Sequence, residues 1–147
     1  MVLHAGLGAE VDTAELVRLA EAAGKRVAWP RLAAAGREMD FATCRATELV
    51  PGPARALQPP DDAPRVSVSE VDVVVVPGVA FDVRGGRLGR GRGHYDATLA
   101  RLPARAWKVG LAFDAQIVDA VPSEPHDTPL DAIVTETRLH RREPAGG

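Results

Sequence analysis

The feature that most constrains the fold is a short run of valines in the middle of the chain. The segment Val71–Val76 is valine throughout except for Asp72. β-branched residues favour strands, and a strand without polar alternation is typical of one buried on both faces of a parallel sheet. The run is far shorter than the ~20 apolar residues that a membrane-spanning helix needs. A sheet with such a strand needs cover on both faces, which indicates an α/β fold.

Helical and strand patterns alternate around this run. Asp12–Ala23 is predicted to be a helix, because Asp12 and Glu15 can form a capping box and Gly24 is a natural stop. A second helix is expected over Tyr95–Leu102, and further strands over Arg26–Trp29, which Pro30 ends, Lys108–Phe113 and Asp131–Thr135. This alternation predicts βαβ units and a mostly parallel sheet.

The segments between these elements are less regular. Glu38–Ala42 and Arg45–Leu49 fit either two strands or one irregular excursion. Pro51–Pro64 holds five of the twelve prolines and is predicted to be a surface loop without regular structure. No repeat or long linker divides the chain, so we expect a single domain over residues 1–137 and a frayed polar tail over residues 138–147.

Charge and cysteine content exclude several classes of function. The formal net charge of −2 argues against a general nucleic-acid binder, and an aromatic content of 4% argues against stacking on bases. Cys44 is the only cysteine, which excludes an internal disulfide and any site with several cysteine ligands. No secretory signal is recognisable at the N-terminus, so a cytoplasmic protein is expected.

The ligand-binding residues are expected in a glycine-rich loop after the buried strand. Residues 85–96 read Gly-Gly-Arg-Leu-Gly-Arg-Gly-Arg-Gly-His-Tyr-Asp. In open α/β sheets, ligands bind beyond the carboxyl ends of strands. Glycines let backbone N–H groups approach an anion, and Arg87, Arg90 and Arg92 add forked donors that suit phosphate. The segment therefore predicts a polyphosphate cradle, although it fits neither the Walker A nor the dinucleotide pattern. The alternative is a flexible arginine-glycine linker of the kind found in RNA-binding tails.

Carboxylates near this loop could hold a hard cation. Asp96 follows the glycines and Asp127 precedes the last expected strand, so adjacent strands would bring them to one sheet edge. Mg²⁺ commonly takes one or two carboxylates together with phosphate oxygens. Each also has a structural alternative, a helix N-cap for Asp96 and a turn former for Asp127. His126 could contact phosphate, act as a general acid, or do neither.

Two segments resemble the signature of the 5-formyltetrahydrofolate cyclo-ligase family, also called methenyltetrahydrofolate synthetases. They are Val74–Asp82 and Arg87–Asp96, and segments around Glu10–Thr13, Trp29–Pro30, Gly110–Gln116 and His126–Asp131 agree. The resemblance implies a Rossmann-like three-layer α/β sandwich that binds ATP, Mg²⁺ and a reduced folate. It also implies ATP-dependent cyclisation of 5-formyltetrahydrofolate to 5,10-methenyltetrahydrofolate with release of ADP and phosphate. The substrate is a small molecule, with no nucleic-acid or membrane partner, and a monomer is expected.

The resemblance assigns roles residue by residue. The implied ATP-binding residues are Arg87, Leu88, Gly89, Arg90, Gly91, Arg92, Gly93, His94 and Tyr95. Those implied for folate are Glu10, Arg90, Gly91, Arg92, Gly93 and His94, with Arg90 and Arg92 as catalytic residues. Asp96 and Asp127 are the implied metal ligands. The Glu10 carboxylate would accept hydrogen bonds from the N–H groups of the pterin ring. The structural alternative for Glu10 is a residue at a helix start, where the helix dipole favours a negative charge.

The sequence also departs from the family pattern. It begins at Met1 almost directly where the family has its first strand, so the family's N-terminal helix, with a lysine and an arginine for the ATP phosphates, is expected to be absent. His94 stands where the family often has tyrosine, and Leu32 stands near a position where an aromatic residue often covers the folate. A catalytically weak relative that binds folate or nucleotide without turnover is therefore the alternative function.

Overall fold

The computed structural model describes residues 1–5, 10–32, 38–53, 56–89, 93–125 and 127–143. The helices in these ranges are α1 (Ala14–Ala22) and α2 (His94–Leu99), with 3₁₀ turns at Ala46–Glu48, Val68–Glu70 and Asp114–Gln116. The strands are β1 (Trp29–Leu32), β2 (Met39–Ala42), β3 (Val50–Pro51), β4 (Leu57–Gln58), β5 (Arg65–Val66), β6 (Val73–Val76), β7 (Ala80–Phe81), β8 (Arg87–Leu88), β9 (Trp107–Leu111), β10 (Ala132–Val134) and β11 (Leu139–Arg141).

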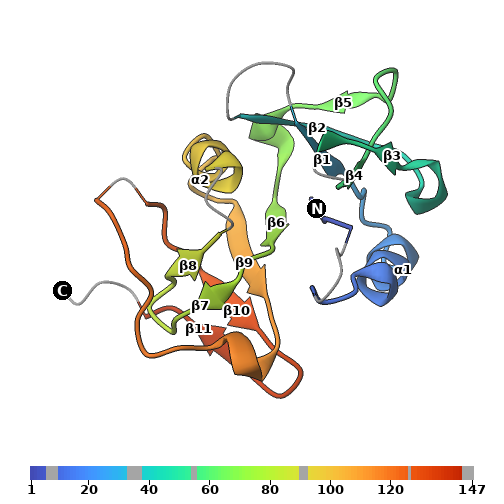
Figure 1. The fold of residues 1–147 in the computed structure, drawn as a ribbon. Coiled ribbons are helices and arrows are strands. Elements are labelled where there is room, and N and C mark those ends of the chain that lie inside the picture. Colours follow the sequence, from blue (N-terminus) through green and yellow to red (C-terminus); the bar gives the residue numbers. More distant parts are fainter. Residues whose placement is uncertain (6–9, 33–37, 54–55, 90–92, 126, 144–147) are drawn as a thin grey trace.

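The valine run forms β6 at the boundary between two sheets (Figure 1). One sheet has the order β11-β10-β9-β6, in which β9 pairs in parallel with both β6 and β10, and β11 pairs antiparallel to β10. The other has the order β1-β2-β5 and is antiparallel. Val2 joins them, because it bridges in parallel to Ala28 on one side and to Val74 on the other.

The structure is an α/β fold, but a mostly parallel sheet is not confirmed. Apart from the bridges of Val2 and Phe81, parallel pairing in the described chain is confined to β6, β9 and β10. The pairs β1–β2, β2–β5, β3–β4, β7–β8 and β10–β11 are all antiparallel. Many of these are strands of two or three residues that no local sequence pattern indicates.

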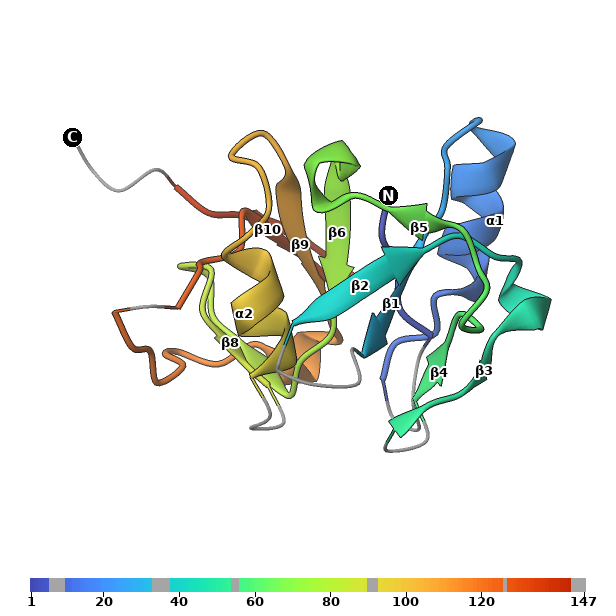
Figure 2. The same ribbon diagram turned by 90° about the horizontal axis from the view of Figure 1, so that it is seen from above.

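Alternate residues of β6 serve two cores on opposite faces. Val74 and Val76 pack in a cluster with Leu99 of α2, whereas Val75 packs in a cluster with Val17 of α1. Figure 2 shows α1 and α2 on different sides of β6. The expected burial of the valine strand on both faces is therefore confirmed.

The first helix is shorter than expected and its start differs. It begins at Ala14 after the N-cap Thr13, and the Asp12 carboxylate accepts a hydrogen bond from the Ala14 N–H at 2.9 Å. Glu15 does not complete a capping box but pairs with Arg18. Gly24 ends the helix as expected: its φ is 74°, and the N–H groups of Gly24 and Lys25 satisfy the last carbonyls.

Three expectations about irregular segments are corrected. The segment after β6, expected to be a loop, contains the β7–β8 hairpin, in which Ala80–Phe81 pairs with Arg87–Leu88 of the glycine-rich stretch. The proline-rich segment contains part of the β3–β4 pair, and Pro30 lies inside β1 rather than after it. The expected frayed tail contains β11, which extends the sheet beside β10. In each case the partner strand is distant in sequence or the pairing is very short, so local signals do not reveal it.

Candidate functional site

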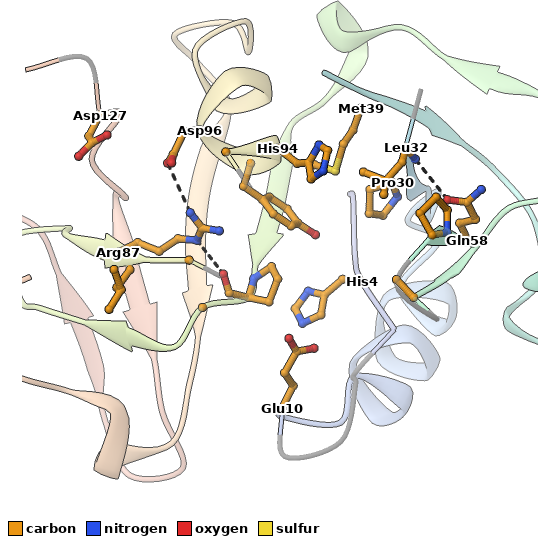
Figure 3. Close-up of a pocket in the computed structure, with 18 of the residues that line it drawn as sticks. His4, Glu10, Pro30, Leu32, Met39, Gln58, Arg87, His94, Asp96 and Asp127 are labelled. Carbon is orange, nitrogen blue, oxygen red and sulfur yellow. Dashed lines mark hydrogen bonds and ion pairs between the residues drawn. The ribbon is translucent and has the colours of Figure 1, made fainter. Parts of the chain in front are cut away.

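A cleft of about 650 Å³ opens where β6 ends. Its walls come from both sides of β6: β1, β2 and the β3–β4 segment on one side, and β8, the start of α2 and the segment before β10 on the other (Figure 3). The lining residues include His4, Glu10, Pro30, Leu32, Met39, Gln58, Pro77, Gly78, Arg87, Leu88, Gly89, Gly93, His94, Tyr95, Asp96, Ser123, Glu124 and Asp127. The expected position beyond the carboxyl end of a parallel strand is thus where the cleft lies.

Arg87 is the best anchored charge of the cleft. Its Nε donates to the Pro77 carbonyl oxygen at 2.7 Å, and its Nη1 lies 3.4 Å from Asp96 Oδ1. The guanidinium also lies over the Tyr95 ring, 5.1 Å from the ring centre. The side chain is only 9% exposed. Burial lowers the pKa of Arg87, but an arginine stays protonated in proteins, so a fixed positive charge stands in the wall.

Asp82 holds the hairpin that presents Arg87. Its carboxylate accepts hydrogen bonds from the N–H groups of Arg84, Gly86 and Val121 at 3.0, 3.0 and 2.8 Å. Burial raises the pKa of Asp82, but these N–H donors outweigh it and hold the pKa below its ordinary value. Asp82 is therefore a turn cap, as its place after a strand allows, and a side chain at Gly86 would collide with it.

The start of α2 brings four of the expected residues to the cleft. Gly93 is the N-cap with φ 72°, a conformation that suits glycine, and His94, Tyr95 and Asp96 form the first turn. All four line the cleft. Burial raises the pKa of Tyr95, which keeps its hydroxyl protonated. Asp96 is not the helix N-cap, which removes that structural alternative.

The two candidate metal ligands lie between the main cleft and a smaller neighbouring cavity. That cavity has a volume of about 390 Å³ and shares Arg87, Asp96, Glu124 and Asp127 with the main cleft. Asp96 pairs with Arg87, and Asp127 Oδ2 accepts from the Glu124 N–H at 2.7 Å, so Asp127 does shape a turn. Within the described residues, His, Cys, Asp and Glu form no group of three that could hold a metal ion. One or two carboxylates would therefore have to act with ligand oxygens.

The far wall holds the expected folate residue Glu10 together with Leu32 (Figure 3). Glu10 lies just before α1, and Leu32 is the last residue of β1. The Leu32 N–H donates to Gln58 Oε1 at 3.3 Å, which ties β1 to β4. Apart from Glu10, the side of the cleft that carries Leu32 is lined by apolar residues such as Pro30 and Met39, whereas Arg87, Asp96 and Asp127 line the other side.

Part of the expected site falls outside the described residues. Arg90, Gly91 and Arg92, assigned to ATP, folate and catalysis, lie there, and so does His126. Of the other assigned residues, Arg87, Leu88, Gly89, Gly93, His94, Tyr95, Asp96, Asp127 and Glu10 all line the one cleft. Their roles stay predictions, but their convergence from distant segments agrees with a shared site.

Sequence reasoning missed three residues of the cleft, His4, Met39 and Gln58. His4 had a detectable signal, because it follows the apolar pair Val2-Leu3, of which Val2 bridges in parallel to Ala28 and Val74. Met39 and Gln58 had none, because their positions depend on the β1–β2 and β3–β4 pairings.

Comparison with known proteins gives consistent results. The 5-formyltetrahydrofolate cyclo-ligase family matches residues 1–136. The 5-formyltetrahydrofolate cyclo-ligase of Escherichia coli K12 is 38% identical over 134 residues, which are 88% of this chain and 74% of that protein. The Mycolicibacterium smegmatis enzyme is 40% identical over 80 residues, and this match spans 54% of this chain and 41% of that protein.

Solved structures show the same relationship. The Aquifex aeolicus 5,10-methenyltetrahydrofolate synthetase superposes with a TM-score of 0.80 at 31% identity, over 99% of this chain and 73% of that one. A Mycoplasma pneumoniae 5,10-methenyltetrahydrofolate synthetase shares the fold, with a TM-score of 0.70 at 21% identity. The matched length and the cleft built from the signature segments lead to one conclusion: the chain belongs to the 5-formyltetrahydrofolate cyclo-ligase family.

Proposed function

We propose that this chain carries out the reaction of its family, the ATP-dependent cyclisation of 5-formyltetrahydrofolate to 5,10-methenyltetrahydrofolate. The observation that carries the proposal is the single cleft into which both signature segments and Glu10 bring their side chains. Its charged end, with Arg87, suits phosphates, and its more apolar end, with Leu32 and Glu10, suits a pterin ring. The two reactants would meet where β6 ends.

The proposed reaction requires that the two reactants be positioned and that the charge of the phosphates be neutralised. A formamide oxygen is a poor leaving group, and transfer of the ATP γ-phosphoryl group to it makes it a good one. The second folate nitrogen then attacks the activated carbon, its proton is lost, the ring closes, and the oxygen departs with phosphate. Such transfers need aligned reactants and fixed charges more than a protein nucleophile. We assign Arg87 to the phosphates, and Arg90 and Arg92, which lie outside the described residues, to the transferred group.

Glycine and backbone positions support the phosphate assignment. Gly93 precedes a helix start, and Gly89 leaves space that a side chain could take only by displacing the Arg87 guanidinium. We place the ATP phosphates against Arg87–Tyr95 and the formyl end of the folate against Arg90–His94. Glu10 accepts hydrogen bonds from the pterin N–H groups in this arrangement.

We propose that Mg²⁺ binds the two carboxylates assigned to it, Asp96 and Asp127. Asp96 and Asp127 offer oxygen ligands, and both border the two cavities. The ion would neutralise phosphate charge during transfer. Arg87 and Asp96 already form an ion pair, so Arg87 orients that carboxylate before any ion binds.

The turnover assay separates the two candidate functions. Methenyl product would be followed by its absorbance, from 5-formyltetrahydrofolate with MgATP, without ATP, and with a non-hydrolysable ATP analogue. Product formed only with MgATP supports the cyclo-ligase. Folate or nucleotide binding without product would identify the catalytically weak relative instead.

Further proposals concern the layer arrangement of the fold, the number of domains, the oligomeric state and the location. We propose a Rossmann-like three-layer arrangement, which α1 and α2 on opposite faces of β6 support. We also propose a single domain that acts as a monomer in the cytoplasm, without nucleic-acid partners. No helix in the described ranges is both long and apolar enough to span a membrane. The β7–β8 hairpin argues against a flexible arginine-glycine linker for the part of the loop that it covers.

A further inference from the structure

His4 occupies a position in the cleft that neither the signature segments nor the family assignment uses. Val2 bridges to Val74 and Ala28, so His4 lies just past the end of this short parallel segment, at the same edge as Pro77. Its carbonyl oxygen accepts a 2.6 Å hydrogen bond from the buried hydroxyl of Thr13, which fixes its backbone. The residue is 5% exposed and still lines the cleft. His4 is therefore a buried imidazole that can contact a ligand bound in the cleft.

The contact with Val75 defines which ring nitrogen carries the proton. His4 Nδ1 lies 3.3 Å from the Val75 carbonyl oxygen. A carbonyl oxygen only accepts, so Nδ1 is the donor, and in the neutral ring Nε2 is then an acceptor. Burial lowers the pKa of His4 and outweighs the opposing effects of Val75 and Glu10. The ring is therefore neutral near pH 7, with its acceptor nitrogen unprotonated.

Glu10 lies beside the His4 ring, and its negative charge acts on that ring. Figure 3 shows the Glu10 carboxylate and the His4 ring directed toward one another at the apolar end of the cleft. A carboxylate beside a neutral imidazole nitrogen gives neighbouring hydrogen-bond acceptors. Such a pair matches a ligand edge with several N–H donors, as a reduced pterin has, and would leave a ligand edge of acceptors unpaired.

We propose that His4 is a specificity-determining residue for the folate, with Nε2 accepting one N–H of the reduced pterin while Glu10 accepts its neighbours. This inference rests on the proposed function. It adds a second acceptor to the recognition of the pterin and makes recognition depend on the neutral state of His4.

The charges around His4 set the sign of the pH dependence. Glu10, before α1, favours the protonated ring, and Arg87, on β8, opposes it; Val75 on β6 and Thr13 contribute neutral groups. When the ring gains a proton, Nε2 becomes a donor, pairs with the Glu10 carboxylate and no longer accepts from the ligand. Because the pKa of His4 is lowered, this loss of affinity comes below the ordinary histidine range rather than at neutral pH.

The test is the equilibrium binding of 5-formyltetrahydrofolate, without ATP, between about pH 4.5 and 8, a range that extends well below the ordinary pKa of histidine. His4→Gln offers a neutral amide oxygen that does not titrate, and His4→Phe keeps the ring but no acceptor. His140→Phe, on β11 outside the cleft, is the matched control. We expect wild type and control to lose affinity toward acid pH, His4→Gln to be nearly independent of pH, and His4→Phe to bind about tenfold more weakly at neutral pH.

The outcomes separate this inference from the proposed function. If the wild type does not bind the folate at any pH, the proposed function is wrong. If the wild type binds but shows no acid loss, or if His4→Phe keeps the wild-type affinity and profile, the role of His4 is wrong while the function stands. Thermal melting checks folding, and if His4→Phe does not fold, the pH profile of His4→Gln decides: an unchanged acid loss overturns the inference.

Discussion

Replacing Arg87 by methionine tests whether its charge acts on the reaction or only on the fold. Methionine keeps much of the buried length but removes the guanidinium. The lost contacts are a charged hydrogen bond to the Pro77 carbonyl, an ion pair between the buried Arg87 and the more exposed Asp96 carboxylate, and a cation–π contact with Tyr95. A charged hydrogen bond contributes about 1.5–3 kcal/mol and an exposed pair about 0.2–1 kcal/mol. We therefore expect the free energy of unfolding to fall by about 2–4 kcal/mol.

The effect on turnover is expected to exceed what this loss of stability explains. Removing a fixed charge that stabilises transferred phosphoryl oxygens commonly costs about 10²–10³ in rate. Steady-state formation of methenyl product, with ATP varied at saturating folate, gives kcat/KM for ATP, and urea denaturation gives the stability under the same buffer conditions.

Arg87→Lys is the matched control because it keeps the charge but not the forked donor. We expect it to retain more activity than methionine while losing the simultaneous contacts to Pro77 and Asp96. A methionine variant that is folded and has wild-type kcat/KM for ATP would refute the phosphate role. Equal activity of the lysine and methionine variants would refute the argument from charge.

Three further predictions test supporting parts of the structure. Asp96→Asn should weaken the activation by Mg²⁺ much more than it lowers the melting temperature, since the Asp96 side chain is 41% exposed; a large fall in melting temperature with normal activation would indicate a structural role. Asp82→Asn should lower the free energy of unfolding at neutral pH by about 1–3 kcal/mol. Because the pKa of Asp82 is lowered, the carboxylate stabilises the fold above its unfolded-state pKa, and this stabilisation disappears as the pH falls through the folded-state pKa. Equal stability of variant and wild type at neutral pH would contradict this role of Asp82. Gly85→Ala should cost about 2 kcal/mol or more in urea denaturation, because φ is +90° and the added Cβ would lie 2.5 Å from the Leu130 carbonyl oxygen; an unchanged midpoint would refute this.

The elements that sequence predicted well carry their own local signals. β6 follows from its valines, and the end of α1 follows from Gly24, whose positive φ permits the closing hydrogen bonds. β8 and β11 were missed because their identity comes from pairing with β7 and β10 and not from their own composition. The sequence predicts Pro30 to end a strand, but Pro30 lies inside β1 opposite Phe41.

The residues of the site likewise divide into those that local sequence signals predict and those that depend on strand pairing. The glycine-rich segment indicated the right sheet edge, because the position after a buried strand is a topological property that sequence order reveals. The opposite wall needs the antiparallel β1–β2 sheet and the β3–β4 pair, so Met39 and Gln58 could not be assigned. Asp127 has both positions that the sequence allows: it accepts the Glu124 N–H within a turn, and it also borders the cleft.

The central claim is that ATP activates the formyl oxygen of a folate bound in this cleft. The most direct measurement is the fate of that oxygen in a single turnover with MgATP and 5-formyltetrahydrofolate labelled with ¹⁸O in the formyl group. We predict that the label appears in the released inorganic phosphate, in step with the methenyl product. Methenyl product accompanied by unlabelled phosphate, with the label in water, would contradict phosphoryl transfer to the formyl oxygen.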